Sequence, residues 1–340
     1  MEFAPKGIVN LGNTCYLNSC IQIFCQFECL NQIVLKVPIH NPTKVEKIFW
    51  ENWKSIVSIM QTASGTKTEF LHPSGLVGAI QQIAKHKRKP IFEQGSPEDI
   101  SEFILFFIDT LHECLTRAIP VQISGHSENA TDDLAIEVYK TLKTEYEKAF
   151  SEILYLFHGV SVSRISSLTS PPKIHSQRVE LFHMLDLPIL AKPCTLYECL
   201  DDYVKPEILD GDNKWYNEES GKYEDIEKSL VFWSFPTILV ICLKRILFDG
   251  QRNHSMVNYP TTLDLQKYAT GYKRTGFVYD LQGICAHIGG MNDGHYTSFV
   301  KKDNHWFYCN DERIQIVEKE EHLLTKYASC LFYMKKNNAL

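Results

Sequence analysis

The chain has 340 residues, of which 44% are hydrophobic and 22% charged, and this balance predicts a soluble globular protein with a large core. Its 35 basic and 41 acidic side chains give a net charge of −6, and no basic run extends beyond residues 85–89, so nucleic acid is not an expected partner. No stretch approaches the roughly 18 apolar residues of a membrane-spanning helix, and residues 1–6 lack a signal-peptide pattern. We therefore expect no membrane association and a cytoplasmic or nuclear location, to which eleven cysteines without a Cys-x-x-Cys pair are suited as reduced thiols.

In the first half of the chain, apolar residues repeat at helical spacing. Residues 14 to about 28 predict a buried helix after a turn-forming Gly-Asn-Thr. A second helix is expected over residues 103–115, with Ser96 as its cap and Pro97 in its first turn. Apolar positions three or four apart predict a third helix from about residue 131 to 157. This half is therefore expected to be mainly helical.

The second half has the composition of strands. Residues 237–243 are rich in β-branched side chains, and residues 277–287 alternate between apolar and polar. Further short strands, separated by Gly, Asn and Asp turns, are expected at residues 296–301, 305–309 and 328–334. Helices followed by antiparallel sheet predict an α+β fold, with the first helix packed across a cleft from the late sheet.

Four groups that a cysteine hydrolase needs have candidates in this chain: a thiolate, a proton-carrying histidine, a group that orients the histidine, and an oxyanion donor. Cys15 supplies a thiol at a helix N-terminus, where the helix dipole favours an anion. His295 begins a strand after a glycine-rich loop, and the next hairpin returns Asn310 or Asp311 to its ring. The Asn10 amide is either an oxyanion donor or a cap of the turn before the helix.

The sequence around these candidates resembles the two signature boxes of the ubiquitin-specific protease family, whose members are deubiquitinating cysteine proteases. The cysteine box is similar over residues 7–19, Gly-Ile-Val-Asn-Leu-Gly-Asn-Thr-Cys-Tyr-Leu-Asn-Ser. The histidine box is similar over residues 279–311, which contain Tyr-x-Leu-x-Gly-x-x-x-His and then Gly-His-Tyr. Family-like landmarks also occur at residues 99–103, 156–159, 209–211, 236–245 and 331–333, so the resemblance covers about residues 7 to 334.

The resemblance implies a papain-like α+β fold of fingers, palm and thumb in a single catalytic domain over residues 1–340. The thumb would span about residues 7–155, the fingers about 156–240 within the palm, and the palm about 240–335. The implied function is hydrolysis of the isopeptide or peptide bond after the C-terminal glycine of ubiquitin, through a thioester intermediate. Ubiquitin and ubiquitinated proteins are then the expected partners of a monomer that needs no cofactor.

The same resemblance assigns roles to individual residues. The implied catalytic residues are the nucleophile Cys15, the general base and acid His295, the orienting residue Asn310 with Asp311 as its competitor, and the oxyanion donor Asn10. The implied substrate contacts are Asp99, Glu102, Gly294 and Tyr296, the first two with basic residues of the ubiquitin tail and the last two along the channel for its glycines. Asp99 and Glu102 also suit the first turn of a helix, where acidic residues are favoured without any ligand.

The chain departs from the family pattern in the fingers and the substrate channel. Family members commonly hold a structural zinc with two Cys-x-x-Cys pairs, and the corresponding positions here are Ser167, Ser170, Asn217 and Ser220. These residues cannot supply thiolates, so we expect a degenerate zinc ribbon, no metal, and fingers held by apolar side chains such as Leu181, Phe182, Leu185 and Phe232. In the channel, residues 97–99 read Pro-Glu-Asp in place of Gln-Gln-Asp, and Ile246 replaces an aromatic residue.

Two other functions fit the same motifs. A protease for a ubiquitin-like modifier would carry the same catalytic residues, and a non-catalytic ubiquitin-binding scaffold would keep the fold. The retention of every catalytic candidate favours the enzyme.

Overall fold

The computed structural model of this chain describes residues 4–62, 70–89, 99–247, 250–290 and 294–336, and within these ranges all α-helices except the last precede the first strand. The α+β class predicted from the sequence is confirmed. The helices of the described residues are α1 (Cys15–Phe24), α2 (Glu28–Lys36), α3 (Lys44–Gln61), α4 (Ser74–His86), α5 (Ile100–Leu115), α6 (Ala130–Ala149), α7 (Glu152–Phe157) and α8 (Leu196–Tyr203). Short 3-10 turns occupy Gly211–Asn213, Gln266–Tyr268 and Glu320–Leu323.

The larger sheet carries the late strands of the chain, in the order β15-β14-β13-β12-β16-β9-β3, with β11 paired to β12. Among its described strands, only the β3 and β9 pair is parallel. These strands are β3 (Met184–Pro188), β9 (Ile238–Lys244), β11 (Thr262–Asp264), β12 (Val278–Gly289), β13 (Gly294–Lys302), β14 (His305–Asn310), β15 (Arg313–Val317) and β16 (Ala328–Lys335). The five strands predicted for the second half lie at β9, β12, β13, β14 and β16.

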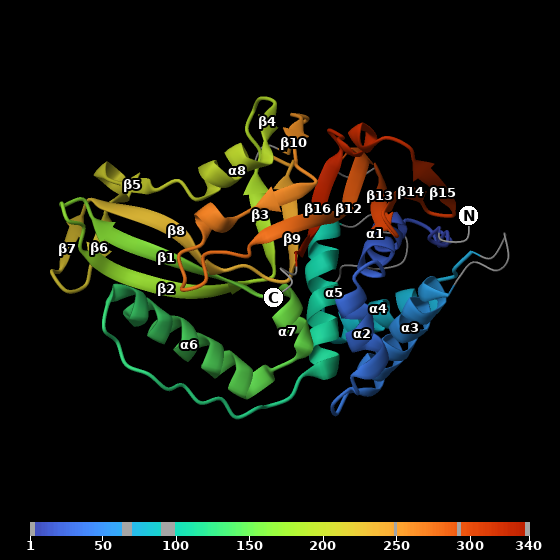
Figure 1. Cartoon of the computed structure of the whole chain (residues 1–340), viewed down its shortest axis with the longest axis horizontal. Coiled ribbons are helices and arrows are strands. Elements are labelled where there is room, and N and C mark those ends of the chain that lie inside the picture. Colours follow the sequence, from blue (N-terminus) through green and yellow to red (C-terminus); the bar gives the residue numbers. More distant parts are fainter. Residues whose placement is uncertain (1–3, 63–69, 90–98, 248–249, 291–293, 337–340) are drawn as a thin grey trace.

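A second, four-stranded sheet extends away from the first, and α6 lies along it (Figure 1). Its order is β2-β1-β8-β5, from β1 (Gly159–Ser167), β2 (Ile174–Phe182), β5 (Glu207–Leu209) and β8 (Ile226–Ser234). Two small pairs complete the described strands: β4 (Cys194–Thr195) with β10 (Val257–Asn258), and β6 (Trp215–Asn217) with β7 (Lys222–Glu224).

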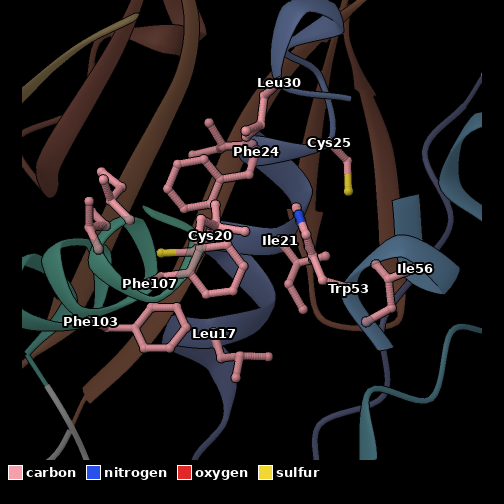
Figure 2. Packing of buried hydrophobic residues seen from close by; sticks show 14 of the residues in the cluster. Leu17, Cys20, Ile21, Phe24, Cys25, Leu30, Trp53, Ile56, Phe103 and Phe107 are labelled. Atoms are coloured by element: carbon pink, nitrogen blue, oxygen red, sulfur yellow. The ribbon is translucent and has the colours of Figure 1, made fainter. Parts of the chain in front are cut away.

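Every residue of α1 is buried, so this helix lies at the centre of the molecule. Figure 2 shows it between Phe103 and Phe107 of α5 on one side and Trp53 of α3 on the other. On the sheet side, a Cβ on Gly283 of β12 would lie 2.7 Å from the Ile23 side chain, so only glycine allows this close approach. The C-terminal end of α1 therefore packs closely against the sheet that carries His295.

Several helix predictions need correction. The helix expected over residues 14–28 ends at Phe24, and α2 begins after a break in which the Asn31 amide donates to the Cys25 carbonyl at 2.8 Å. The helix expected over residues 131–157 is two helices, because Phe150 is extended and exchanges two backbone hydrogen bonds with Arg117. Helices α3 and α4 were not predicted.

The apolar residues expected to hold the fingers divide between two clusters. Leu181 packs with Leu134 and Val138 of α6 and with Trp233 of β8. The other expected residues, Phe182, Leu185 and Phe232, belong to or pack on the cluster that joins this sheet to the larger one. No helix within the described part of the chain is long and apolar enough to cross a membrane.

Candidate active site

Cys15 is the first residue of α1 and is only 6% exposed. Burial raises the pKa of its thiol, because the charged thiolate is poorly solvated there, and the carboxylate of Asp311 raises it further. Hydrogen bonding from the backbone N–H of Tyr296, the residue after His295, acts in the opposite direction. The balance favours the protonated thiol, so a base must take its proton before it can attack.

The turn before α1 is shaped by left-handed backbone at Gly12 and Asn13, with φ of 93° and 52°. The side-chain oxygen of Asn10, Oδ1, accepts hydrogen bonds from the N–H groups of Gly12 at 2.9 Å and Thr14 at 3.3 Å. Its amide nitrogen donates to Asp311 Oδ2 at 2.9 Å. Because a side-chain amide has two N–H groups, Asn10 closes the turn with its oxygen and retains a second donor.

His295 and Asn310 meet across the hairpin of β13 and β14. Asn310 Oδ1 lies 2.8 Å from His295 Nε2, whereas Asp311 Oδ2 lies 3.8 Å from the same nitrogen. An amide oxygen can only accept, so this bond places the proton of the neutral ring on Nε2 and leaves Nδ1 as the proton acceptor. Of the two residues considered for orienting the histidine, Asn310 makes the hydrogen bond.

Asp311 has different partners, in the turn between β14 and β15. Its φ is 50°, and its carboxylate accepts from Asn18 Nδ2 at 2.7 Å as well as from Asn10. Its backbone oxygen accepts from the Ile8 N–H at 2.9 Å. A Cβ on Gly7 would lie 2.3 Å from the Glu312 carbonyl oxygen, so the N-terminal segment and this turn approach as closely as backbones can. Asn18 was not predicted to belong to the site, although an amide residue one turn after Cys15 in a helix expected to be buried was a usable signal.

A cavity of about 460 Å³ opens beside the thiol. It is lined by Cys15 and by all four expected substrate contacts, Asp99, Glu102, Gly294 and Tyr296. Asp99 is the N-cap of α5, and its Oδ1 accepts from the N–H groups of Ser101 at 2.8 Å and Glu102 at 3.2 Å. The helix thus begins at Ile100 with Asp99 as its cap, and the cap and first turn expected at Ser96 and Pro97 lie outside the described residues.

His287 and Arg252 also line this cavity, and neither was predicted to belong to the site. Arg252 donates to His287 Nδ1 at 2.5 Å and to its backbone oxygen at 2.8 Å. The imidazole lies against the Tyr296 ring, with centroids 4.3 Å apart. A Cβ on Gly294 would lie 2.0 Å from His287 Nε2, so the glycine before His295 is required by the ring that covers it.

Three of the four positions of the missing zinc ligands, Ser167, Asn217 and Ser220, are occupied by hydrogen-bonded residues. Asn217 Nδ2 and Ser220 Oγ donate to the same oxygen of Glu224, at 3.1 and 2.5 Å. Ser167 Oγ accepts from the Lys173 N–H at 2.8 Å. Within the described ranges, no group of three or more His, Cys, Asp or Glu residues is arranged to hold a metal ion.

The family model and the most similar curated proteins point to the same family. The model of the ubiquitin carboxyl-terminal hydrolase family matches residues 6–333. Ubiquitin carboxyl-terminal hydrolase 16 of Arabidopsis thaliana is 28% identical over 98% of this chain, and ubiquitin carboxyl-terminal hydrolase 4 of Candida glabrata is 27% identical over 96%. The chain spans only 31% and 40% of the length of these two relatives.

The fold is shared with solved structures. The SAGA Ubp8/Sgf11/Sus1/Sgf73 DUB module bound to ubiquitin aldehyde contains a similar chain, with a TM-score of 0.75 and 24% identity over 99% of this chain and 71% of that one. A variant of the same module, bound to monoubiquitin, gives a TM-score of 0.74 and 23% identity over the same shares.

Proposed function

Because the chain belongs to the ubiquitin carboxyl-terminal hydrolase family, we propose that it is a thiol-dependent deubiquitinase. Its substrate is the isopeptide or peptide bond after the C-terminal glycine of ubiquitin. The observation that carries this proposal is the hydrogen bond between His295 and Asn310. The residue after His295 is Tyr296, whose backbone N–H is hydrogen-bonded to the Cys15 sulfur. Ubiquitin is also the bound partner named for the structurally similar modules.

The proposed reaction begins with transfer of the Cys15 proton to His295 Nδ1. The thiolate then attacks the carbonyl carbon of the terminal glycine, and the second N–H of Asn10 donates to the oxyanion. His295 returns its proton to the leaving amine as the C–N bond breaks, which leaves ubiquitin as a thioester on Cys15. Water, deprotonated by His295, attacks the thioester, and the thiol and the ubiquitin carboxylate are released. Asn310 keeps the imidazole in the required tautomer and orientation.

In this proposal the cavity beside Cys15 holds the extended tail of ubiquitin. Asp99 and Glu102 line its wall and offer carboxylates to the basic residues of the tail. Gly294 and Tyr296 lie closer along the chain to the catalytic histidine and would flank the terminal glycines. The departures at residues 97–99 and Ile246 affect this same channel, with residues 97 and 98 outside the described part of the chain.

We further propose the division into a thumb of about residues 7–155, fingers of about 156–240 within the palm, and a palm of about 240–335. The four-stranded sheet would form the fingers, and the larger sheet the palm. Strand β3 falls in the finger range but pairs with β9, which is consistent with fingers that emerge from the palm. A monomer in the cytoplasm or nucleus remains the expected state.

Reaction with modifier probes tests the proposed function. Ubiquitin carrying a C-terminal electrophile should form a covalent adduct with the wild-type protein, and Cys15→Ala should abolish both the adduct and hydrolysis while ubiquitin binding stays measurable. His295→Ala should lower turnover by about 10²–10⁴-fold, because it removes the proton carrier. Capture by probes of a ubiquitin-like modifier instead would identify a different substrate, and ubiquitin binding without any adduct would identify a scaffold.

A further inference from the structure

Asn18 differs in its hydrogen-bond partners from Gln22, the other buried amide side chain of α1. Its side chain is 2% exposed and lies within 3.4 Å of the Ile8 and Val9 carbonyl oxygens, as expected for a residue that fixes the N-terminal segment. Its shortest contact, however, is the 2.7 Å bond to Asp311 Oδ1. Gln22, one turn further along the helix, also fixes the N-terminal segment, through a 2.7 Å bond to the Lys6 carbonyl oxygen.

Asp311 connects Asn18 to the proposed oxyanion donor. Its side chain is 10% exposed, and its two carboxylate oxygens accept from two different amides, Oδ1 from Asn18 and Oδ2 from Asn10. A carboxylate held at both oxygens cannot rotate without breaking one of these bonds. The direction of the Asn10 amide is therefore set by Asp311, and the direction of the Asp311 carboxylate by Asn18.

We infer that Asn18 is a positioning residue for the hydrolysis, and that it acts through Asp311 to aim the second N–H of Asn10 at the oxyanion. This role rests on the proposed function. Cys15 and Asn18 lie three residues apart and so project from the same side of α1. The nucleophile and the anchor of the oxyanion donor thus belong to one rigid element, and their separation is fixed by the helix itself.

The position of the negatively charged Asp311 near the thiol is explained if Asp311 holds the Asn10 amide in place. Asp311 raises the pKa of the Cys15 thiol, which by itself disfavours the thiolate that attacks. Its hydrogen bond with Asn10 orients the amide that stabilises the oxyanion later in the reaction, and this stabilisation offsets the less favourable thiolate.

The test uses Asn18→Leu in the full chain, with ubiquitin bearing a C-terminal aminocoumarin as substrate. Complete loss of one oxyanion donor typically costs about 10²–10³-fold in kcat, so a misaimed donor should cost about 10- to 100-fold. KM should stay within about twofold of wild type, because the tail contacts are untouched. In an Asn10→Ala background the same substitution should add less than about twofold, because the two residues act as one unit.

Gln22→Leu is the matched control, since Gln22 is equally buried on the same helix and its side-chain oxygen, like that of Asn18, has no hydrogen-bond partner among the described residues. Its kcat should stay within about twofold of wild type. A ubiquitin probe ending in an alkyne provides the second readout. The thiol adds across the triple bond to give a vinyl thioether, so no oxyanion forms, and Asn18→Leu should be captured at nearly the wild-type rate.

A wild-type kcat for Asn18→Leu, or equal losses in Gln22→Leu, would overturn the inference. So would a fully additive effect with Asn10→Ala, or loss of alkyne capture by the folded variant, since Asn18 would then act on the thiol. If Asn18→Leu does not fold, Asn18→Ser carries the same test, because its shorter side chain leaves room for water beside Asp311. A wild-type protein that neither hydrolyses ubiquitin substrates nor captures the probe would instead overturn the proposed function itself.

Discussion

Asp311 and the backbone N–H of Tyr296 act on the Cys15 thiol in opposite directions. Burial is the largest cause of the raised pKa, and the Asp311 carboxylate adds to it, whereas the N–H stabilises the thiolate. Below the raised pKa the thiol keeps its proton. In the free protein, therefore, reaction with a small alkylating reagent should increase as pH rises beyond the ordinary thiol value of 9.0.

Asp311→Asn should lower the pKa of Cys15, because it removes a negative charge and keeps the shape of the side chain. The midpoint of the pH dependence of iodoacetamide alkylation should shift downward, and alkylation at pH 8 should be faster than in wild type. Hydrolysis of the ubiquitin substrate should nevertheless be slower than in wild type, because Asn10 loses its carboxylate partner. Cys15→Ser identifies the alkylated thiol, and Asp186→Asn, at a carboxylate that lines the cavity beside Lys244, is the charge control. An unchanged or higher midpoint in Asp311→Asn would contradict this account.

Helix α5 shows how one residue can serve both the fold and the site. Asp99 caps this helix and also lines the cavity. Its hydrogen bonds with the described residues use Oδ1, and the second carboxylate oxygen has no hydrogen bond within that part of the chain that a cationic side chain would have to displace. Serine can replace the cap but not the charge, which allows the two roles to be separated.

We predict that Asp99→Ala lowers the free energy of unfolding by about 1 kcal/mol, and that Asp99→Ser lowers it by much less. Both should raise KM for the ubiquitin substrate to a similar extent, because both remove the charge. Thermal or urea denaturation and steady-state kinetics measure the two effects. Asn129→Ala is the control, because Asn129 caps α6 in the same way and does not line the cavity; it should lose stability without a change in KM. A wild-type KM for Asp99→Ser would leave Asp99 with the capping role alone.

The late strands were predictable because their signals are local. Apolar alternation and Gly, Asn and Asp turns placed β13 and β14 to within two residues at each end. The helix breaks were not predictable, because the apolar repeat continues through them and the interruption comes from tertiary pairing, as between Arg117 and Phe150. For α3 a local signal did exist, in the capping box of Thr43 and Glu46.

The same distinction applies to the site. Cys15, His295, Asn10 and the Asn310–Asp311 pair were found through their motifs. Within that pair, Asn310 bonds to His295, 15 positions away. Asp311 bonds instead to Asn10 and Asn18, about 300 positions away, and no local pattern contains these two long-range bonds. Arg252 and His287 were not predicted to belong to the site for the same reason, since their contact joins the segment after β9 to strand β12.

At the scale of the whole molecule, the four-stranded sheet extends away from α1, the helix that begins at Cys15 (Figure 1), so contacts within this part of the molecule have to stabilise it. Glu224 gathers two donors at the positions where the family resemblance would place zinc ligands, Asn217 and Ser220. These hydrogen bonds join the last residue of β6 and the turn that follows it to the last residue of β7.

We predict that the purified protein contains no stoichiometric zinc, and that a strong chelator changes neither its thermal midpoint nor its rate of ubiquitin hydrolysis. A structural zinc contributes on the order of 10 kcal/mol in small zinc modules, so dependence on one would be obvious. Glu224→Ala should lower the midpoint, whereas Glu227→Ala, at an acidic residue of β8, should not. Metal analysis and thermal denaturation measure these outcomes, and one tightly bound zinc whose removal unfolds the protein would contradict them.

The close contact of the N-terminal segment with the turn at Asp311 also has a consequence for the nascent chain. The Ile8 N–H bonds to the Asp311 carbonyl oxygen, and Asn10 and Asn18 bond to its carboxylate, across about 300 residues of sequence. The ribosome delivers Cys15, Asn10 and Asn18 long before His295 and Asp311. The cysteine therefore leaves the ribosome without the groups that surround it in the folded protein, and the proposed site can assemble only after β13, β14 and the turn at Asp311 have been made and have packed against α1 and the N-terminal segment.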